Sequence, residues 1–253
     1  EHQGREAFQE LDYRQVFGSI AKYATEITDV RRTADIIRRA WSMAVSGRPG
    51  PVVVALPEDI LTQTADILIP QQKIKIPLGG AMPQDVLQLS KKMQGAQRPV
   101  IMVGGGGWTD QDRSALQKCV NKVNIPVVTA FRYHDLFDNT DPLYLGEAGV
   151  GMTANTKRIL QEADVVLAVN LRFGEMTTDA FSLFGQERSG QWIAQTHRSG
   201  DEFHKYVSPD LAMICSPSAV LQSLRDRLAR SNMQVDTTWV AAARAGFETT
   251  QQA

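Results

Sequence analysis

Three glycine-containing loops carry the residues whose types and spacing suit the binding of a phosphate. The first is the run of four glycines at 104–107, which follows a short apolar stretch. Glycine has no side chain to keep a ligand from the backbone, and a helix that begins after such a run presents free N–H groups to an anion. The run predicts a strand-to-helix turn. Both a phosphate site and a purely structural turn are consistent with it.

This glycine run departs from the standard dinucleotide-binding pattern. Counted from Gly104 or Gly105, the third glycine of that pattern would fall at Thr109 or Asp110. The next apolar stretch ends at Ala130 without the acidic residue that usually binds a ribose. We therefore do not expect a conventional NAD site.

The second and third loops are weaker signals of the same kind. The second spans 146–153, and in the third Arg172 comes just after an apolar stretch. An arginine at a strand end can bind a phosphate through two hydrogen bonds, although a single arginine there is more often a solvated surface charge. Open α/β domains bind ligands at the edge of the sheet where these loops would lie. The residues predicted to bind a cofactor are Gly104, Gly105, Gly106, Gly149, Gly151 and Arg172.

The elements that would position these loops alternate along residues 83–230. Short apolar stretches predict strands, and amphipathic stretches predict helices. Strands that are apolar along their whole length indicate a parallel sheet with helices on both faces. We predict an α/β fold, with a doubly wound, parallel, six-stranded Rossmann-like domain. Five of its strands can be located in the sequence, at 99–103, 126–130, 164–169, 191–196 and 211–215. Its expected helices start near Gln84, cover 110–123 and 154–163, and begin after Ser216.

Residues 1–60 predict a partial α/β unit. A helix is expected over 30–46, and a strand over 52–56 follows a Gly-Pro turn. A single strand forms no sheet, so we expect most of its neighbours upstream of Glu1. The expected apolar face of the helix consists of Ile36, Ile37, Ala40, Trp41 and Ala44.

Composition excludes several classes of function. The chain has 253 residues, with 27 basic against 28 acidic side chains and no long run of either sign. We therefore expect neither a nucleic-acid partner nor an anionic membrane surface as a partner. No apolar stretch is long enough to span a membrane, and we expect a cytoplasmic protein.

Other catalytic signals are weak. The sequence has no Gly-x-Ser-x-Gly elbow, no P-loop and no cysteine–histidine nucleophile pair. The histidines do not fall at metal-ligand spacing, so we infer no metal site. His134 with Asp135, and the pair His197 and His204, are candidate acid–base groups, but we expect these histidines to be loop residues near solvent. Cys119 and Cys215 are expected to be small core residues rather than a disulfide.

Taken in this order, the loops resemble the thiamine-diphosphate-dependent enzyme family that includes acetolactate synthase, benzaldehyde lyase and oxalyl-CoA decarboxylase. The most specific part is 46–59, which begins Ser-Gly-Arg-Pro-Gly-Pro-Val. The resemblance covers most of the chain and looks closest to acetolactate-synthase-like members. The other segments that carry it are 4–10, 20–22, 98–100 with the glycine run, 146–155, 163–164 and 172–178.

The resemblance implies an order of domains. Residues 1–60 would be the C-terminal part of a pyrimidine-binding domain, and 83–230 the central domain. Residues 61–82, which hold several prolines and glycines without periodicity, would be a linker. Residues 231–253, with a helix around 239–247, would be a connector toward a diphosphate-binding domain.

The resemblance also implies the activity of the whole protein, a transferase or lyase that decarboxylates a 2-keto acid with thiamine diphosphate and Mg²⁺. The glutamate that activates the cofactor would lie upstream of Glu1 and the metal motif beyond Ala253, so this fragment alone is expected to be inactive. It would contribute Phe8, Gln9 and Lys22 to the active-site wall, although a core position for Phe8 is an equal alternative. The parent protein would be a homodimer or homotetramer.

In the synthases of this family the central domain binds FAD, and here the sequence departs from their pattern. Residues 193–199 lack the acidic residue expected near the adenosine, and Asn170 replaces a glycine two residues before Arg172. The sequence is consistent with FAD, ADP or no ligand in the central domain. We expect the full-length protein to be colourless, that is, without bound FAD. The alternative to an enzyme is a non-catalytic nucleotide-binding or structural module that mediates subunit contacts.

Overall fold

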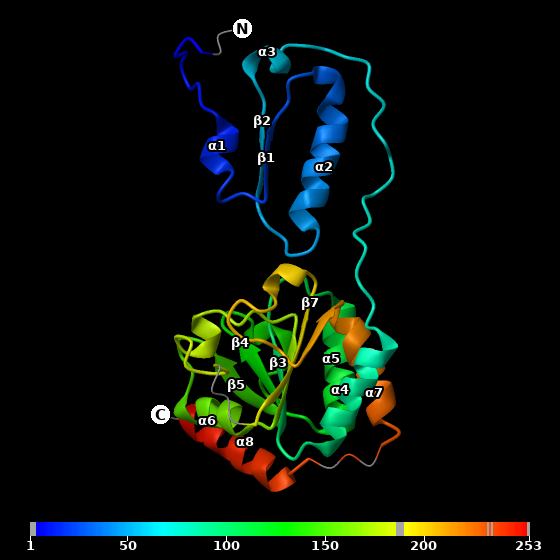
Figure 1. Ribbon diagram of the computed structural model, residues 1–253, viewed down its shortest axis with the longest axis vertical. Helices are drawn as coiled ribbons and strands as arrows, with labels where there is room; N and C mark the ends of the chain where they lie inside the picture. The colour runs from blue at the N-terminus through cyan, green and yellow to red at the C-terminus, as the bar shows by residue number, and fades with distance from the viewer. Residues whose placement is uncertain (1–3, 186–189, 232, 234, 252–253) are drawn as a thin grey trace. The chain divides into compact units, whose positions relative to one another are not determined.

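The structure is a computed structural model that describes residues 4–185, 190–231, 233 and 235–251. The chain divides into two compact units, Glu1–Pro77 and Leu78–Ala253 (Figure 1). The larger second unit contains the three glycine-containing loops, and the first unit contains Phe8, Gln9 and Lys22.

The second unit is built on a six-stranded sheet in which every strand pair is parallel, with the order β5-β4-β3-β6-β7-β8. This confirms the predicted fold class. The chain runs outward from β3 to one edge and then returns to β6 beside β3, from where it runs to the other edge. The strands are β3 (Pro99–Val103), β4 (Val127–Ala130), β5 (Tyr144–Ala148), β6 (Val165–Val169), β7 (Trp192–His197) and β8 (Leu211–Ile214).

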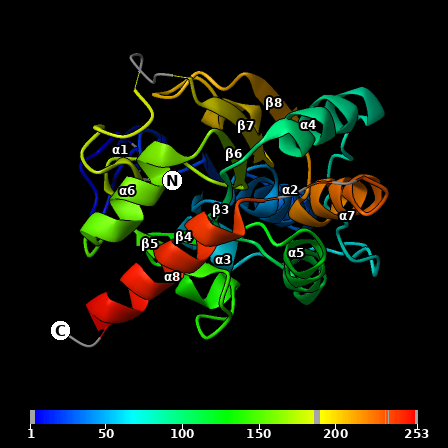
Figure 2. The same ribbon diagram turned by 90° about the horizontal axis from the view of Figure 1, so that it is seen from below.

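Helices cover both faces of this sheet. Successive residues of a strand point to opposite faces, so a strand that is apolar throughout has apolar side chains to bury on both sides. In β3, Ile101 and Val103 belong to one apolar core, and Val100 and Met102 to the other. Figure 2 shows α4, α5 and α7 on one side of the sheet and α6 and α8 on the other. These helices are α4 (Pro83–Gly95), α5 (Asp110–Val123), α6 (Ala154–Glu162), α7 (Pro217–Leu228) and α8 (Thr237–Gln251).

Polar residues fix the starts of α5 and α7 where the sequence predicts them. Thr109 and Asp112 form a reciprocal capping box at the start of α5. Ser216 caps α7, with Pro217 as its first residue. The Asp112 carboxylate also accepts a hydrogen bond of 2.8 Å from the Ser218 N–H, so it joins the starts of the two helices. Burial raises the pKa of Asp112, but the hydrogen bonds from Thr109 and Ser218 lower it more, and the net shift is downward.

Strand β5 was not predicted, because its Leu-Gly-Glu segment interrupts the apolar pattern. Gly146 and Glu147, expected in a loop, lie in this edge strand. Gly146 has φ +106°, and a Cβ atom there would lie 2.7 Å from the Thr156 hydroxyl oxygen and 3.2 Å from the Phe247 ring. The glycine therefore allows close packing of the strand against α6 and α8.

Helix α8 is part of the second unit. Trp239, Ala243 and Phe247 are buried, and the Trp239 indole N–H donates to Glu162 of α6 at 2.9 Å. The Asn155 side chain donates to the Ala243 carbonyl oxygen at 2.9 Å. The predicted helix in this region thus covers the domain that precedes it; whether residues 231–253 also connect to a further domain stays a prediction.

The first unit contains a parallel pair of strands, β1 (Tyr23–Glu26) and β2 (Val52–Ala55). The sequence predicted β2 but missed β1, which has little apolar character. Helix α2 (Thr33–Val45) was predicted with too wide an apolar face, since Ile36 and Ala40 are buried whereas Ile37 and Trp41 are exposed. The unit also contains α1 (Tyr13–Phe17), η1 (Val30–Arg32) and α3 (Glu58–Leu61), and residues 62–82 form no helix or strand.

Candidate functional site

The candidate site lies where the strand order reverses, between β3 and β6. Open α/β sheets bind ligands outside the carboxyl ends of the strands at such a switch point. The glycines at 104–107 follow β3, and Asn170 and Arg172 follow the neighbouring β6. Gly149 and Gly151 follow β5, two strands away from β3. The structure therefore brings the first and third loops together at the crevice and leaves the second farther along the same edge.

The buried residue Asn170 connects the loop after β6 to the glycine run after β3. Its backbone is left-handed, with φ +52°, a conformation that asparagine tolerates better than most residues. Its side-chain nitrogen donates to the carbonyl oxygens of Gly104 and Gly106, at 3.3 and 3.1 Å, and its backbone N–H donates to the Thr196 hydroxyl at 3.2 Å. Asn170 is buried, so the glycine run rests on a polar side chain of the same chain.

Internal packing requires glycine at Gly104 and Gly105, and a left-handed backbone (φ +81°) favours glycine at Gly107. A Cβ atom at Gly104 would lie 2.8 Å from Ala130 and Leu171, and one at Gly105 would lie 2.2 Å from the Asn170 carbonyl oxygen. At Gly107 a Cβ atom would lie 2.3 Å from the Arg198 guanidinium. A Cβ atom at Gly106 would have open space around it. The structural interpretation of the run accounts for Gly104, Gly105 and Gly107, and Gly106 is the position left for a ligand.

Unpaired polar atoms mark the same crevice. Among the described residues, the side-chain atoms Asn170 Oδ1, Gln195 Oε1 and Arg198 Nε are buried without a hydrogen-bond partner. The other end of the Gln195 amide donates to the Leu171 carbonyl oxygen at 3.0 Å. Buried polar atoms are almost always paired, so exceptions point to bound water or a ligand. These two acceptors and one donor lie just after β6, within β7 and just after β7, beneath the loops at the switch point.

Arg172 makes an ion pair that the sequence did not predict. Its Nε atom donates to the Glu202 carboxylate at 3.1 Å, and the Lys205 ammonium lies 3.1 Å from the other carboxylate oxygen. Glu202 belongs to η4 (Gly200–Glu202), which follows β7 next to β6. The Glu202 side chain is only 2% exposed, whereas Arg172 and Lys205 are 48% and 52% exposed.

The predicted active-site wall residues lie in the first unit. Phe8 is 93% exposed, so in this unit it is not a core residue. Gln9 is exposed, with a left-handed backbone at φ +63°. The Lys22 ammonium donates to the carbonyl oxygens of Ser46 and Arg48, which fixes the loop between α2 and β2.

The histidines and cysteines differ in how well their environments were predicted. His197 is buried in β7, with Nδ1 bonded to the Ser199 backbone, so its predicted loop position near solvent is wrong. His134 is half-exposed beside Glu147, and His204 is exposed. Cys119 and Cys215 are free and buried as predicted, and burial raises the pKa of each thiol to about 12. No three His, Cys, Asp or Glu side chains of the described residues cluster in a way that would hold a metal ion.

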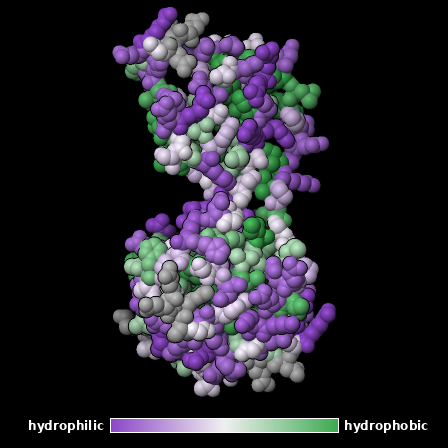
Figure 3. All heavy atoms as spheres, in the orientation of Figure 1, coloured by the Kyte–Doolittle hydropathy of each residue, from purple (hydrophilic) through white to green (hydrophobic). Residues whose placement is uncertain are grey.

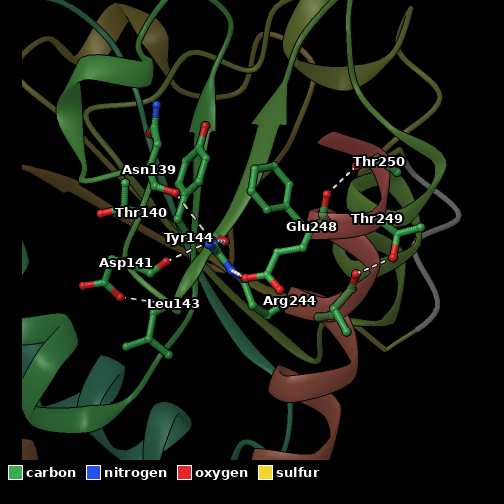
Figure 4. A network of polar contacts seen from close by, with 12 residues as sticks. Asn139, Thr140, Asp141, Leu143, Tyr144, Arg244, Glu248, Thr249 and Thr250 are labelled. Carbon is green, nitrogen blue, oxygen red and sulfur yellow. Dashed lines mark hydrogen bonds and ion pairs between the residues drawn. The ribbon is translucent and has the colours of Figure 1, made fainter. Parts of the chain in front are cut away.

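A cavity of about 600 Å³ lies at the outer edge of β5, and its lining includes the predicted site residue Gly151 with Gly146, Glu147 and Thr153 of the second loop. The sequence did not predict that α8 forms part of this lining. Arg244 of α8 lies in its wall (Figure 4). The Arg244 guanidinium donates to the carbonyl oxygens of Asn139, Asp141 and Tyr144, at 3.5, 3.0 and 2.9 Å, and to Glu248 at 2.7 Å. No local pattern could have shown this, because the bonded carbonyl groups lie about a hundred residues earlier in the chain.

Comparison with known families gives the same class as the fold. The family described as thiamine pyrophosphate enzyme, central domain, matches residues 86–224, which is more than half of the chain. The chain therefore belongs to this family. Among the described residues, no helix has both the length and the apolar character needed to cross a membrane.

Proteins similar to this chain include acetolactate synthases. The chain is 30% identical over 243 residues to a probable acetolactate synthase large subunit of Methanocaldococcus jannaschii, an alignment that covers 94% of this chain and 41% of that protein. It is 26% identical over 234 residues to acetolactate synthase isozyme 3 large subunit of Escherichia coli (90% and 40%) and 29% identical over 245 residues to acetolactate synthase 1, chloroplastic, of Oryza sativa (94% and 37%). The chain spans about two-fifths of the length of these relatives.

Proposed function

We propose that the chain forms part of a thiamine-diphosphate-dependent enzyme that decarboxylates a 2-keto acid and joins the product to a second carbonyl compound. The supporting observation is that similarity to acetolactate synthase large subunits extends over 94% of the chain and so includes the first unit as well as the central domain. In this proposal, 1–60 end a pyrimidine-binding domain, 61–82 link it to the central domain at 83–230, and 231–253 lead toward a diphosphate-binding domain.

The cofactor of this activity would be thiamine diphosphate with Mg²⁺. When bound, thiamine diphosphate supplies the carbon nucleophile that removes carbon dioxide from a 2-keto acid. From the family resemblance, we propose that the groups that bind and activate it lie outside this chain. Phe8, Gln9 and Lys22 would line the active site without taking part in proton transfer.

The crevice between β3 and β6 would be a separate site for an adenine nucleotide such as ADP or FAD. Gly106 leaves room for a phosphate beside the backbone, and the half-exposed Arg172, in the loop after the neighbouring strand β6, would pair with that phosphate. Gly104 and Gly105 shape this turn, and Gly149 and Gly151 would contact only a ligand that extends toward β5. Asn170 in place of a glycine and the lack of an acidic residue over 193–199 remove contacts to an adenosine, so we expect weak binding and a colourless full-length protein.

Calorimetric titration tests the division of roles. We expect the chain itself to give no saturable heat with thiamine diphosphate and Mg²⁺. A longer polypeptide that contains it should release carbon dioxide from pyruvate or 2-oxobutyrate only when both are present, and should form a carbon–carbon bonded product. Micromolar binding of thiamine diphosphate to the chain alone would contradict the proposed division, and a longer polypeptide inactive toward 2-keto acids would contradict the proposed activity.

A second candidate function is that of a non-catalytic nucleotide-binding module that mediates subunit contacts. A nucleotide site in the crevice is equally consistent with this function and with the enzyme, because nothing in the crevice depends on thiamine chemistry. In either case we propose a cytoplasmic homodimer or homotetramer. A full-length protein that binds ADP but shows no thiamine-diphosphate-dependent reaction would favour the second function.

A further inference from the structure

Glu202 is a buried carboxylate in the turn after β7, and Arg172 and Lys205 are two of its partners. Its two oxygens lie 3.1 Å from Arg172 Nε and 3.1 Å from Lys205 Nζ. Arg172 and Lys205 remain half-exposed, so both charges are also within reach of a ligand that enters from solvent. The carboxylate faces the same guanidinium that a phosphate would use.

The ion pair limits what Arg172 can offer to a phosphate. Arginine binds carboxylates and phosphates through the same planar set of N–H donors, and the Nε donor is already bonded to Glu202. A buried carboxylate that loses one of its partners is strongly destabilised. A phosphate that turned Arg172 away from Glu202 would carry that cost, and a phosphate bound beside the intact pair would meet the field of a nearby negative charge.

We propose that Glu202 is a specificity-determining residue of the crevice, one that weakens the binding of nucleoside diphosphates by holding Arg172. The inference rests on the proposed nucleotide site between β3 and β6. Lys205 has the opposite effect on phosphate binding. It pairs with the same carboxylate, and so weakens the ion pair between Glu202 and Arg172. Removing the charge of Glu202 while keeping its shape should release Arg172 for a phosphate.

The neighbouring Asp201 provides a matched control. It precedes Glu202 in the same turn, but its side chain is exposed and bonds to the Ser199 hydroxyl at 3.1 Å. Asp201→Asn therefore changes the net charge by the same amount at almost the same place without touching Arg172. An effect of Glu202→Gln that Asp201→Asn does not share is due to the ion pair and not to the overall charge.

The test is calorimetric titration of the purified chain with ADP and with adenosine, at one ionic strength. We expect Glu202→Gln to bind ADP at least tenfold more tightly than the wild type, with adenosine binding unchanged because adenosine has no phosphate. Asp201→Asn should change the ADP affinity less than twofold. Adding Arg172→Ala to Glu202→Gln should abolish the gain.

A gain absent in Glu202→Gln, or equal in Asp201→Asn, would overturn the proposal. Should Glu202→Gln fail to fold, as judged by its circular dichroism, Lys205→Met provides a second variant at a half-exposed position. It removes one of the cations that pair with the Glu202 carboxylate, so the carboxylate should hold Arg172 more strongly and ADP should bind at least threefold more weakly. Unchanged or tighter binding would overturn the proposal. If wild-type chain binds ADP tightly and Arg172→Ala does not alter that binding, the nucleotide lies elsewhere, and it is the proposed crevice site that fails.

Discussion

The two units of the chain differ in how much of their apolar surface they bury by themselves. In the second unit, a six-stranded sheet lies between two layers of helices, and strands β3, β4 and β6 are buried along their whole length. In the first unit, the described buried apolar residues are Ile27, Ile36, Ala40 and Ile60, and no residue of its two strands is fully buried. Figure 3 shows apolar side chains on the surface of the first unit.

This difference indicates which unit can be stable alone. A two-stranded sheet with one helix of appreciable length buries too little apolar surface to offset the entropy lost on folding. The first unit depends on contacts that it does not itself supply. Its exposed large apolar residues are Phe8, Leu11, Val16, Ile20, Ile37, Trp41, Leu56, Leu61, Leu68 and Ile69.

Separating the units should give the largest effect. We expect residues 78–253 to unfold cooperatively on heating, and residues 1–77 to show no cooperative transition, because only the former have a two-sided core. Circular dichroism melts of the two polypeptides measure this. A sigmoidal melt of 1–77 would show that its small core suffices and would remove the contrast between the units.

A pair of leucine substitutions sharpens the contrast at single residues. Leu167→Ala removes a fully buried side chain from the centre of β6 and should lower the free energy of unfolding of the second unit by about 2–5 kcal/mol. Leu68→Ala replaces a side chain that is 90% exposed, and should change the free energy of unfolding by less than about 0.5 kcal/mol. Urea denaturation of the full chain measures both. Similar losses would mean that Leu68 is covered in solution.

Two neighbouring glycines test whether the crevice turn is fixed by internal packing. Gly105 has a left-handed backbone with φ +69°, and a Cβ atom added there would clash with Asn170. Gly105→Ala should therefore destabilise the second unit by about 1–3 kcal/mol. Gly106→Ala should be nearly neutral, because it meets open space and its φ is not positive. Chemical denaturation distinguishes the two. Equal tolerance would show that the turn rearranges readily.

The smallest expected effect concerns the capping box of α5. The folded-state pKa of Asp112 is below its ordinary value of 3.8, so its stabilising contribution is complete above the unfolded-state pKa and is lost as the pH falls through the folded-state pKa. Asp112→Asn should lower stability at pH 6 by about 0.5–2 kcal/mol and flatten the decline in stability below pH of about 4. Unfolding of residues 78–253 in urea across this range measures it, with the exposed Asp110→Asn as control.

The sequence predicted local features better than the contacts between distant segments. Runs such as 99–103 and 164–169 are apolar throughout, and the structure has β3 and β6 there. Strand β5 was missed because Gly146 interrupts its apolar pattern, and one reason for a glycine there, the close packing of Phe247, comes from a helix about a hundred residues later. For the candidate site, the sequence placed Arg172 at a strand end but could not show its bond to Glu202, because that contact depends on β6 and β7 being neighbours.

The covering of β5 by α8 has a consequence for synthesis of the chain. Strand β5 is an edge strand, and an uncovered edge can pair with a strand of another molecule. Arg244 binds the carbonyl groups of Asp141 and Tyr144, and Phe247 packs against Gly146, but both residues emerge from the ribosome about a hundred residues after β5. During that interval the edge of a nascent sheet is open to neighbouring chains, and its exposure ends when α8 docks.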